Sequence, residues 1–329
     1  MIDFDKAQEK LNKFGGSEKK TTVLYNGERY MLKYPDPIRE GSRLQGELSY
    51  KNNQFSEYIG CQIFKACGFK VQDALLGYYT DKGTGKRKLV VACKDFTQDG
   101  SVLYEFKDVG NQALVDKAKL SLHIEEVYAV INEVPLIKNK AEMIACFWDM
   151  FVVDALIGNR DRHLGNWGIL ESSDTYEFAP IYDCGSSLSA LMPDEKMESL
   201  MLKPGMFKNE TYNITSCYYL DDKRIFYHEI FKNPPADLAA AIRRIVPRIN
   251  MEQIHAIIDA TPEMSDVRKQ YLKKALDLRY REILMPALSR ELAQEQKPSL
   301  MATLRKHAER AKAQDQGLPP KNGRDDFDR

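Results

Sequence analysis

The chain has 329 residues, of which 43% are hydrophobic, so it is long enough to bury a large core in one domain or in two lobes. Its 48 basic and 48 acidic residues give a formal net charge of zero, which excludes a global electrostatic attraction to nucleic acid or to an anionic membrane. No apolar run approaches the roughly 18 residues that cross a bilayer, and the N-terminal sequence is too polar for a signal peptide. We therefore expect a soluble, cytoplasmic protein, and export or translocation into another cell stays open.

The six cysteines occur singly, mostly inside apolar runs, and none belongs to a cluster with the spacing of a zinc site. This pattern predicts buried free thiols in a reducing compartment. We therefore do not expect disulfide bonds to stabilise the fold.

A glycine-rich loop and a β-hairpin are expected near the N-terminus. The loop contains Gly15, Gly16 and Ser17 and is followed by two lysines, a composition that lets backbone N–H groups approach phosphate oxygens. An ordinary polar turn has the same composition, so the loop alone does not identify a phosphate site. The hairpin is predicted from two β-rich runs, Thr21–Tyr25 and Arg29–Tyr34, which are joined by an Asn-Gly pair.

Lys33 lies inside the second strand of this hairpin, on the same face as Met31. An edge strand would leave the lysine in solvent, whereas a buried lysine needs a partner because an unpaired ammonium is costly to bury. The partner that we expect is Glu57, in the first turns of a helix with apolar residues at helical spacing across residues 52–67. A strand lysine paired with a helix glutamate is the arrangement that contacts the α- and β-phosphates of ATP in kinases.

Further strands are predicted at Val71–Tyr79 and Lys88–Ala92, and they complete a β-rich lobe over residues 1–92. The chain then passes from an apolar strand into a polar loop, which is where the linker between two kinase lobes is expected. The backbone groups of Ala92, Cys93 and Lys94 are the candidates to receive the adenine base.

Residues 93–288 are predicted to form a mainly helical lobe, and residues 289–329 a fraying helix and a disordered tail. Ala141–Ile157 is apolar almost all round, which is typical of a central buried helix. Thr261 followed by Pro262 has the composition of a helix N-cap with proline at the first helical position, and predicts a long helix that ends near Pro286. Shorter helices are predicted at Ile124–Ile131, Ala236–Val246 and Met251–Ala260.

The most specific polar motif is GNRDRHLGNWGIL, which is followed after a short hairpin by PIYDCGSSL. Asp161 precedes Asn166 by five residues, which is the separation of the base and the metal-binding asparagine in the protein-kinase loop. Asp183 opens a D-x-G sequence and supplies a further oxygen of the kind that Mg²⁺ prefers. Phosphoryl transfer needs a carboxylate that orients the acceptor hydroxyl and oxygens that hold magnesium across the phosphates. Arg160 and Arg162 could steady phosphate, but loop arginines are more often solvated.

Three interpretations of this motif compete. In the first, a kinase, His163 either braces the loop through hydrogen bonds or helps to neutralise the transferred phosphate. In a metal hydrolase, Asp161, His163 and Asp183 would hold a transition metal, but such a site favours more histidines than the five of this chain. A catalytically silent nucleotide-binding module is the third interpretation, and the complete set with Lys33 and Asn166 argues against it.

Taken together, these motifs resemble those of the HipA-like kinases, in which a D-x-H-x-x-N loop is followed by a Y-D sequence near the metal. The loop also resembles that of phosphatidylinositol kinases, so a kinase that acts on a lipid or a small molecule is the alternative within the fold. Within the HipA-like family, the compact length and the GGSEKK sequence look most similar to its compact, cell-translocating members. The additional N-terminal subdomain of the family is not expected before Gly15, so an antitoxin partner is not supported.

The resemblance implies a two-lobed, protein-kinase-like α+β fold with a small β-rich N-lobe and a mainly helical C-lobe. It implies ATP and Mg²⁺ as cofactors, and a protein with a serine or threonine acceptor as the substrate.

The same resemblance implies roles for individual residues. Asp161 would be the catalytic base, Asn166 and Asp183 the magnesium ligands, and Lys33 the contact to the ATP phosphates. The glycine-rich loop would cover these phosphates, and Ser17 within it would be a site of autophosphorylation. A phosphate there would place about two negative charges where the phosphates of ATP belong.

Overall fold

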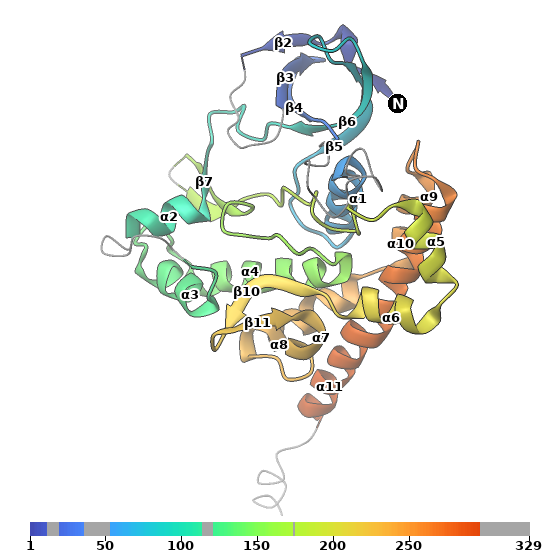
Figure 1. Ribbon diagram of the computed structural model, residues 1–329. Helices are drawn as coiled ribbons and strands as arrows, with labels where there is room; N and C mark the ends of the chain where they lie inside the picture. Colours follow the sequence, from blue (N-terminus) through green and yellow to red (C-terminus); the bar gives the residue numbers. More distant parts are fainter. Residues whose placement is uncertain (12–19, 36–52, 114–120, 174, 297–329) are drawn as a thin grey trace, which may run out of the picture. The chain divides into compact units, whose positions relative to one another are not determined.

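The computed structural model describes residues 1–11, 20–35, 53–113, 121–173 and 175–296. The predicted loop residues Gly15, Gly16 and Ser17 lie outside the described residues. The chain divides into two units, Met1–Leu288 and Ser289–Arg329. The first unit contains a curled β-sheet, drawn in blue and teal in Figure 1, and a mainly helical part, drawn from green to orange.

The N-terminal sheet has six strands in the order β1-β5-β6-β4-β3-β2 among the described residues. β1 pairs with β5 in parallel, and the other neighbours are antiparallel. The predicted hairpin is confirmed: Asn26 and Gly27 have φ values of 52° and 81°, as a tight two-residue hairpin turn requires. The strands are β1 (Ile2–Asp3), β2 (Gln8–Lys10), β3 (Lys20–Tyr25), β4 (Glu28–Lys33), β5 (Ala74–Thr80) and β6 (Arg87–Lys94).

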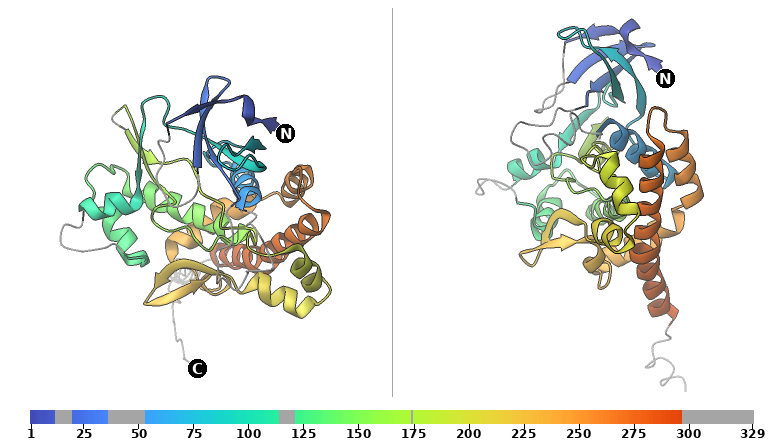
Figure 2. Two further views of the ribbon diagram at one scale, coloured as in Figure 1. Left: turned by 45° about the horizontal axis from the view of Figure 1, so that its top comes forward. Right: turned by 45° about the vertical axis from the view of Figure 1, so that its right-hand side comes forward.

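The two faces of this sheet enter different clusters because side chains alternate along a strand. On one face, Tyr30 and Leu32 of β4 pack in a small cluster that Phe4 of the short 3₁₀ helix η1 (Phe4–Lys6) helps to close. On the other face, Met31 joins the main core together with Ile59 of helix α1 (Asn53–Ala66). α1 therefore lies against β5 and β6, as Figures 1 and 2 show.

The helical part is organised around α4, which is confirmed as a central helix. Every residue from 150 to 157 is buried, and the flanking helices α3, α8 and α10 pack against α4. Asn139 caps its start by accepting a hydrogen bond from the backbone N–H of Glu142, and Gly158 ends it with φ of 67°. The helices are α2 (Phe106–Ala113), α3 (Ile124–Glu133), α4 (Lys140–Ile157), α5 (Asp194–Met201), α6 (Pro204–Tyr212), α7 (Tyr227–Ile230), α8 (Ala236–Ile245), α9 (Met251–Ala260), α10 (Asp266–Arg279) and α11 (Met285–Gln296).

Two small sheets and two irregular helical segments complete the described structure. β7 (Val102–Glu105), β8 (Gly168–Ser172) and β9 (Thr175–Phe178) form one sheet, and β10 (Thr215–Leu220) and β11 (Lys223–Phe226) form another. A 3₁₀ helix spans Val246–Arg248, and a π-helical segment spans Tyr280–Leu284.

The long C-terminal helix differs from its prediction at both ends. Thr261 follows α9 rather than opening a helix, and its hydroxyl donates to the carbonyl of Ile257 at 2.9 Å. α10 starts later, with Ser265 as its N-cap. Pro286 does not end the helix, because the π-helical turn directly before it interrupts the regular hydrogen-bond pattern where a proline would otherwise clash.

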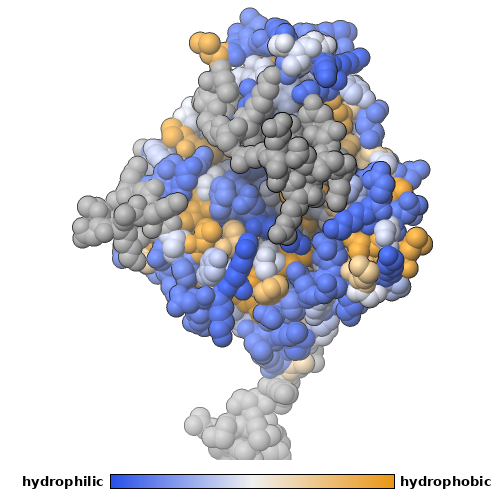
Figure 3. All heavy atoms as spheres, viewed as in Figure 1, coloured by the Kyte–Doolittle hydropathy of each residue, from blue (hydrophilic) through white to orange (hydrophobic). Residues whose placement is uncertain are grey.

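All six cysteines are free, and five of them are buried, so the prediction of free thiols is confirmed. On the face shown in Figure 3, the described surface is mainly hydrophilic, and hydrophobic side chains form small separate patches. No helix in the described part of the chain combines the length and the apolar character that a membrane crossing requires.

Candidate active site

Lys33 is the centre of a buried ion network that joins three parts of the chain. Its Nζ lies 3.2 Å from Oε2 of Glu57 and 3.1 Å from Oδ1 of Asp183. Lys33 and Glu57 are buried, whereas the side chain of Asp183 keeps 38% of its surface exposed. The expected pair of Lys33 and Glu57 is therefore present, and the structure adds Asp183 to it.

Nearby charge and burial shift the pKa of Asp183 in opposite directions. Burial pushes its pKa upward, but the charge of Lys33 and the hydrogen bond from it outweigh burial and hold that pKa below its usual value. Asp183 also has φ of 56°, a left-handed conformation that is uncommon for a residue with a side chain. Asp183 is thus ionised at neutral pH and held in a strained backbone.

Helix α1 docks directly on the loop that follows Asp183. A Cβ at Gly60 would lie 2.5 Å from the Cβ of Cys184, which is closer than two such carbons approach in real structures. The hydroxyl of Ser56 donates to the carbonyl of Ser187 at 2.8 Å. These contacts set the position of Glu57, one turn earlier than Gly60, relative to Asp183.

Arg162 is buried, with 2% of its surface exposed, which contradicts the prediction of a solvated loop arginine. Its Nε and Nη2 donate to the two carboxylate oxygens of Asp154 on α4, at 2.9 and 3.1 Å. Its Nη1 donates to the carbonyls of Asn166, at 2.9 Å, of Asp183, at 3.2 Å, and of Tyr182. Burial opposes the charge of Arg162, but Asp154 helps to raise its pKa well above the usual value. One side chain therefore joins the end of α4 to both polar motifs.

A signal for this role was present in the sequence. Asp154 is an acidic residue in an otherwise apolar helix, and a buried carboxylate requires a partner. Arg162 is the arginine that fills this need, eight residues later.

Asp161 and Asn166 lie in the loop that Arg162 anchors. The backbone N–H of Asp161 donates to Oδ1 of Asn159 at 3.1 Å, and Nδ2 of Asn166 donates to the carbonyl of Asp161 at 2.7 Å. The carboxylate of Asp161 is exposed and accepts one long hydrogen bond, of 3.4 Å, from Ser186. Its backbone is therefore held firmly while its carboxylate keeps spare acceptor capacity.

His163 is exposed, and its Nδ1 accepts a hydrogen bond from the backbone N–H of Gly165 at 3.1 Å. This contact favours the interpretation in which His163 braces the loop. In the described part of the chain, no three His, Cys, Asp or Glu side chains are placed to hold one metal ion. Asp161, His163 and Asp183 thus do not form the three-ligand site that a metal hydrolase would need.

The structure corrects the position of the predicted linker, because Ala92, Cys93 and Lys94 lie inside the central strand β6. β6 pairs with β4 on one side and with β5 on the other over these residues. The N–H of Lys94 donates to the carbonyl of Asp73 at 2.8 Å, and its carbonyl accepts from Nε2 of Gln72 at 3.0 Å. Since these backbone groups are already paired, a linker that offers free ones begins after Lys94.

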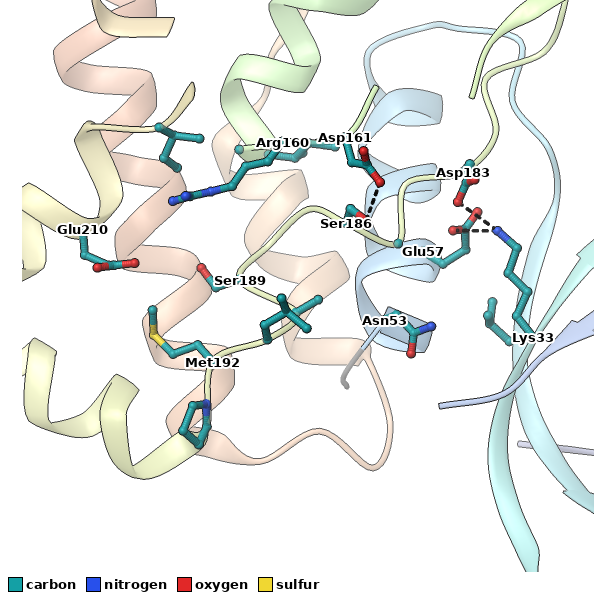
Figure 4. Close-up of a pocket in the computed structure, with 18 of the residues that line it drawn as sticks. Lys33, Asn53, Glu57, Arg160, Asp161, Asp183, Ser186, Ser189, Met192 and Glu210 are labelled. Carbon is teal, nitrogen blue, oxygen red and sulfur yellow. Dashed lines mark hydrogen bonds and ion pairs between the residues drawn. The ribbon is translucent and has the colours of Figure 1, made fainter. Parts of the chain in front are cut away.

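A cavity with a volume of about 570 Å³ connects the predicted residues (Figure 4). One end is lined by Lys33, Glu57 and Asp183, and Asp161 and Ser186 lie farther along the wall. The structure therefore brings Lys33, Glu57, Asp161 and Asp183 to one cavity, with Asn166 anchored beside them through Arg162.

Comparisons with known proteins agree with this geometry. Residues 13–264 match the model of the HipA-like C-terminal domain. The chain is 38% identical over 287 residues to the serine/threonine-protein kinase CtkA of Helicobacter pylori, and the match covers 85% of each protein. The crystal structure of a Helicobacter pylori proinflammatory kinase CtkA is similar with a TM-score of 0.80 and 36% identity, over 90% of this chain and 99% of that one. The resemblance to compact HipA-like kinases and the kinase-like α+β fold are thereby confirmed.

Proposed function

Because the chain belongs to the family of HipA-like C-terminal domains, we propose that it is a protein kinase that transfers the γ-phosphate of ATP to serine or threonine hydroxyls. The observation that carries this proposal is the cavity that contains both the Lys33–Glu57–Asp183 network and the exposed carboxylate of Asp161. A phosphate-binding cation and a base facing one cavity are what phosphoryl transfer requires of a protein.

Asn166 and Asp183 are the residues that would hold Mg²⁺. Both offer oxygen, which Mg²⁺ prefers, and their main chains are bonded to the same nitrogen of Arg162. The bound ion would neutralise phosphate charge and orient the transferred group. Lys33, already held against Asp183, would contact the phosphates from the side of the sheet.

Asp161 would orient the acceptor hydroxyl and take its proton. Its carboxylate is exposed, and Ser186 is its sole hydrogen-bond donor among the described residues. The hydrogen bond from Asn166 to its carbonyl keeps the loop in place when a substrate binds. His163, through its bond to Gly165, would support the same loop.

The phosphate cover formed by Gly15, Gly16 and Ser17, and the phosphorylation of Ser17 by the protein itself, remain part of the proposal. The adenine base would contact the chain after Lys94 rather than within Ala92–Lys94. Phosphopeptide mapping after incubation with ATP tests the autophosphorylation of Ser17. Label on other residues and not on Ser17 would contradict it.

Incubation with labelled ATP and Mg²⁺ tests the function itself, with transfer measured to the protein and to serine peptides. Wild type and the control variant Asp108→Asn, which changes an exposed carboxylate on α2, should incorporate label. Asp183→Asn should reduce incorporation by at least about a hundredfold, because it removes a proposed metal ligand. Equal labelling of Asp183→Asn and wild type would contradict the assigned role. ATP binding without any transfer would instead favour the silent module, and transfer to lipid alone would favour the lipid-kinase alternative.

A further inference from the structure

The cavity continues past Asp161 into a second half that the catalytic residues leave unused. We call it the acceptor half, and it is formed by residues from the start of the catalytic loop, from the chain before α5, and from α5, α6 and α10 (Figure 4). Its polar and charged lining residues are Arg160, Ser189, Lys196, Glu210 and Arg279.

Among the described residues, no carboxylate pairs with the buried guanidinium of Arg279. Only 3% of its surface is exposed, and no carboxylate in the described part of the chain is among the charged groups that act on it. Its Nε donates to the carbonyl of Leu156 at 2.5 Å and its Nη1 to the carbonyl of Thr211 at 3.4 Å, while its Nη2 makes no hydrogen bond to a described residue. Burial lowers the pKa of Arg279 to about 10, and the charge of Arg160 acts in the same direction. Arg279 nevertheless stays protonated at neutral pH.

A structural role accounts for only part of this arrangement. The carbonyl of Leu156 belongs to the last turn of α4, where a cation is favourable, so the Nε of Arg279 has a reason to be there. This role explains neither the unused Nη2 nor the convergence of Arg160 and Lys196 on the same half of the cavity. Three cationic side chains face one carboxylate, that of Glu210, among the described residues that line it.

A second buried polar group, the hydroxyl of Tyr271, lies behind the lining residue Ser189 of this half. Tyr271 on α10 is fully buried, and its hydroxyl makes no hydrogen bond of normal geometry, although the Ser189 side chain lies near it. Arg160, Arg279 and Glu210 all lie close enough to Tyr271 to affect its pKa, which burial raises. Tyr271 does not line the cavity itself, so it lies behind Ser189 and helps to fix the position of that lining residue.

The loop that carries Ser189 has a backbone conformation that its surroundings hold fixed. Leu188 and Ser189 have φ values of 52° and 55°, strained conformations that persist where the surroundings enforce them and that cluster at ligand sites. Farther along, Arg268 of α10 donates to the carbonyl of Met192 at 2.5 Å and to Asp194 at 2.8 Å. The wall opposite Arg160 is therefore preorganised.

We propose that the acceptor half binds an anionic group of the protein substrate, a carboxylate or a phosphate close to the acceptor hydroxyl. The inference rests on the proposed function, because Asp161 lies between the two halves and would orient the hydroxyl while the anion contacts Arg160 and Arg279. Guanidinium groups bind planar carboxylates and phosphates through paired hydrogen bonds, which gives both charge and geometric selectivity.

The test compares peptides that share one acceptor serine and differ only in the residues beside it: Gln, Glu, Lys or phosphoserine. For wild type, kcat/KM for the Glu or phosphoserine peptide should exceed that for the Gln peptide by about tenfold or more, since hydrogen bonds to charged groups are strong. The Lys peptide should be the poorest substrate. The Glu and phosphoserine arms distinguish a carboxylate from a phosphate as the preferred anion.

Variants connect this preference to the acceptor half. Arg160→Gln should lower the ratio of the Glu to the Gln peptide about tenfold, and Arg160→Lys should give an intermediate ratio because it keeps the charge. Arg281→Gln, an exposed arginine on the π-helical segment outside the cavity lining, is the control and should keep the wild-type ratio. Calorimetry with the same peptides carrying alanine in place of the acceptor serine should show the same order of affinities.

The outcomes separate the inference from the function that it rests on. Equal kcat/KM for the Glu and Gln peptides, or a ratio that Arg160→Gln leaves unchanged, would overturn the anion site while phosphate transfer itself stands. Absence of transfer to every peptide and to the protein would overturn the kinase assignment. Calorimetry would then still decide on the anion site, since tighter binding of the Glu peptide by wild type than by Arg160→Gln needs no catalysis.

Discussion

Asp161 and Arg162 are neighbours in the sequence, but their side chains have opposite environments. Arg162 belongs to a buried anchor, which we define as its side chain, Asp154 and the carbonyls of Asn166 and Asp183. Asp161 belongs to an exposed rim, where its carboxylate accepts one long hydrogen bond. In the anchor, most hydrogen-bonding groups are used inside the protein, whereas the rim keeps its acceptors available.

The difference shows how this site divides two tasks. Groups that never touch a substrate determine where the loops lie, and they can do so because a buried, bidentate ion pair has few alternative geometries. Asp161, which would take the proton from the acceptor, stays exposed, and little of the folding free energy depends on its side chain. Changes in the anchor should therefore affect stability and activity together, and changes in the rim should affect activity alone.

The largest effect is expected in the anchor. Arg162→Leu leaves the Asp154 charge buried without a partner and should lower the free energy of unfolding by about 3–5 kcal/mol, with loss of transfer. Urea denaturation and the labelling assay measure the two quantities. Arg160→Leu, in the same loop but exposed, should change stability by no more than about 0.5 kcal/mol.

A double variant sharpens this prediction. Asp154→Leu combined with Arg162→Leu removes both charges and should recover part of the lost stability, because no unpaired charge remains buried. Activity should not return, since the carbonyls of Asn166 and Asp183 still lack their common donor. A double variant less stable than Arg162→Leu alone would argue against the ion pair as the source of the effect.

At the rim, we expect a substitution to lower activity and leave stability unchanged. Asp161→Asn should lower kcat by about 10²–10⁴, the usual contribution of a general base. Its free energy of unfolding should stay within about 0.5 kcal/mol of wild type, because the carboxylate is exposed and weakly bonded. A variant that retains more than a tenth of the wild-type kcat would show that Asp161 is not the base.

A smaller effect is expected where α1 meets the loop after Asp183. Gly60→Ala introduces a Cβ 2.5 Å from that of Cys184 and should cost about 1–3 kcal/mol of stability, as overpacking does. The displaced α1 should also weaken the contact of Glu57 with Lys33 and lower the transfer rate. Gly205→Ala on α6, whose Cβ would meet nothing within 4 Å, is the matched control and should be neutral or slightly stabilising. Equal effects of the two substitutions would contradict the docking argument.

The smallest effect concerns pH. In wild type, Lys33 holds the pKa of Asp183 below its usual value of 3.8, so the stability from this contact is present above pH 3.8 and is lost as pH falls through the lowered pKa. In Lys33→Met, the largest compensating charge and its hydrogen bond are lost, so burial raises the pKa of Asp183 relative to wild type, although Arg162 and Lys20 still act against burial. The stability difference between wild type and Lys33→Met should thus be larger at pH 7 than at pH 3. Denaturation at both values measures it, and a difference that does not depend on pH would contradict the coupling.

Features that depend on neighbours in sequence were predictable from the residues alone. The turn at Asn26 and Gly27 needs only residues that tolerate positive φ, and α4 needs only its apolar composition. The spacing of Asp161 and Asn166 is likewise local. The contact between Lys33 and Glu57 was predictable from the sequence because a buried charge needs a partner of opposite sign.

Other features depend on partners that the sequence does not identify. Ala92–Lys94 has the composition of a strand end, and only the pairing of β6 with both neighbours shows that the strand continues through it. Thr261 and Pro262 have the composition of a helix start, yet the hydroxyl of Thr261 bonds back to α9.

The sequence by itself determined the kinase-like motifs, their order and the chemistry of their side chains, since residue type and spacing suffice for these. Only the tertiary structure decided which of two adjacent loop residues is buried, because burial depends on the elements packed around the loop. It therefore assigned Arg162 to the anchor and left Asp161 at the rim. It also gathered Arg160, Lys196 and Arg279, from three separate segments, around one half of a cavity.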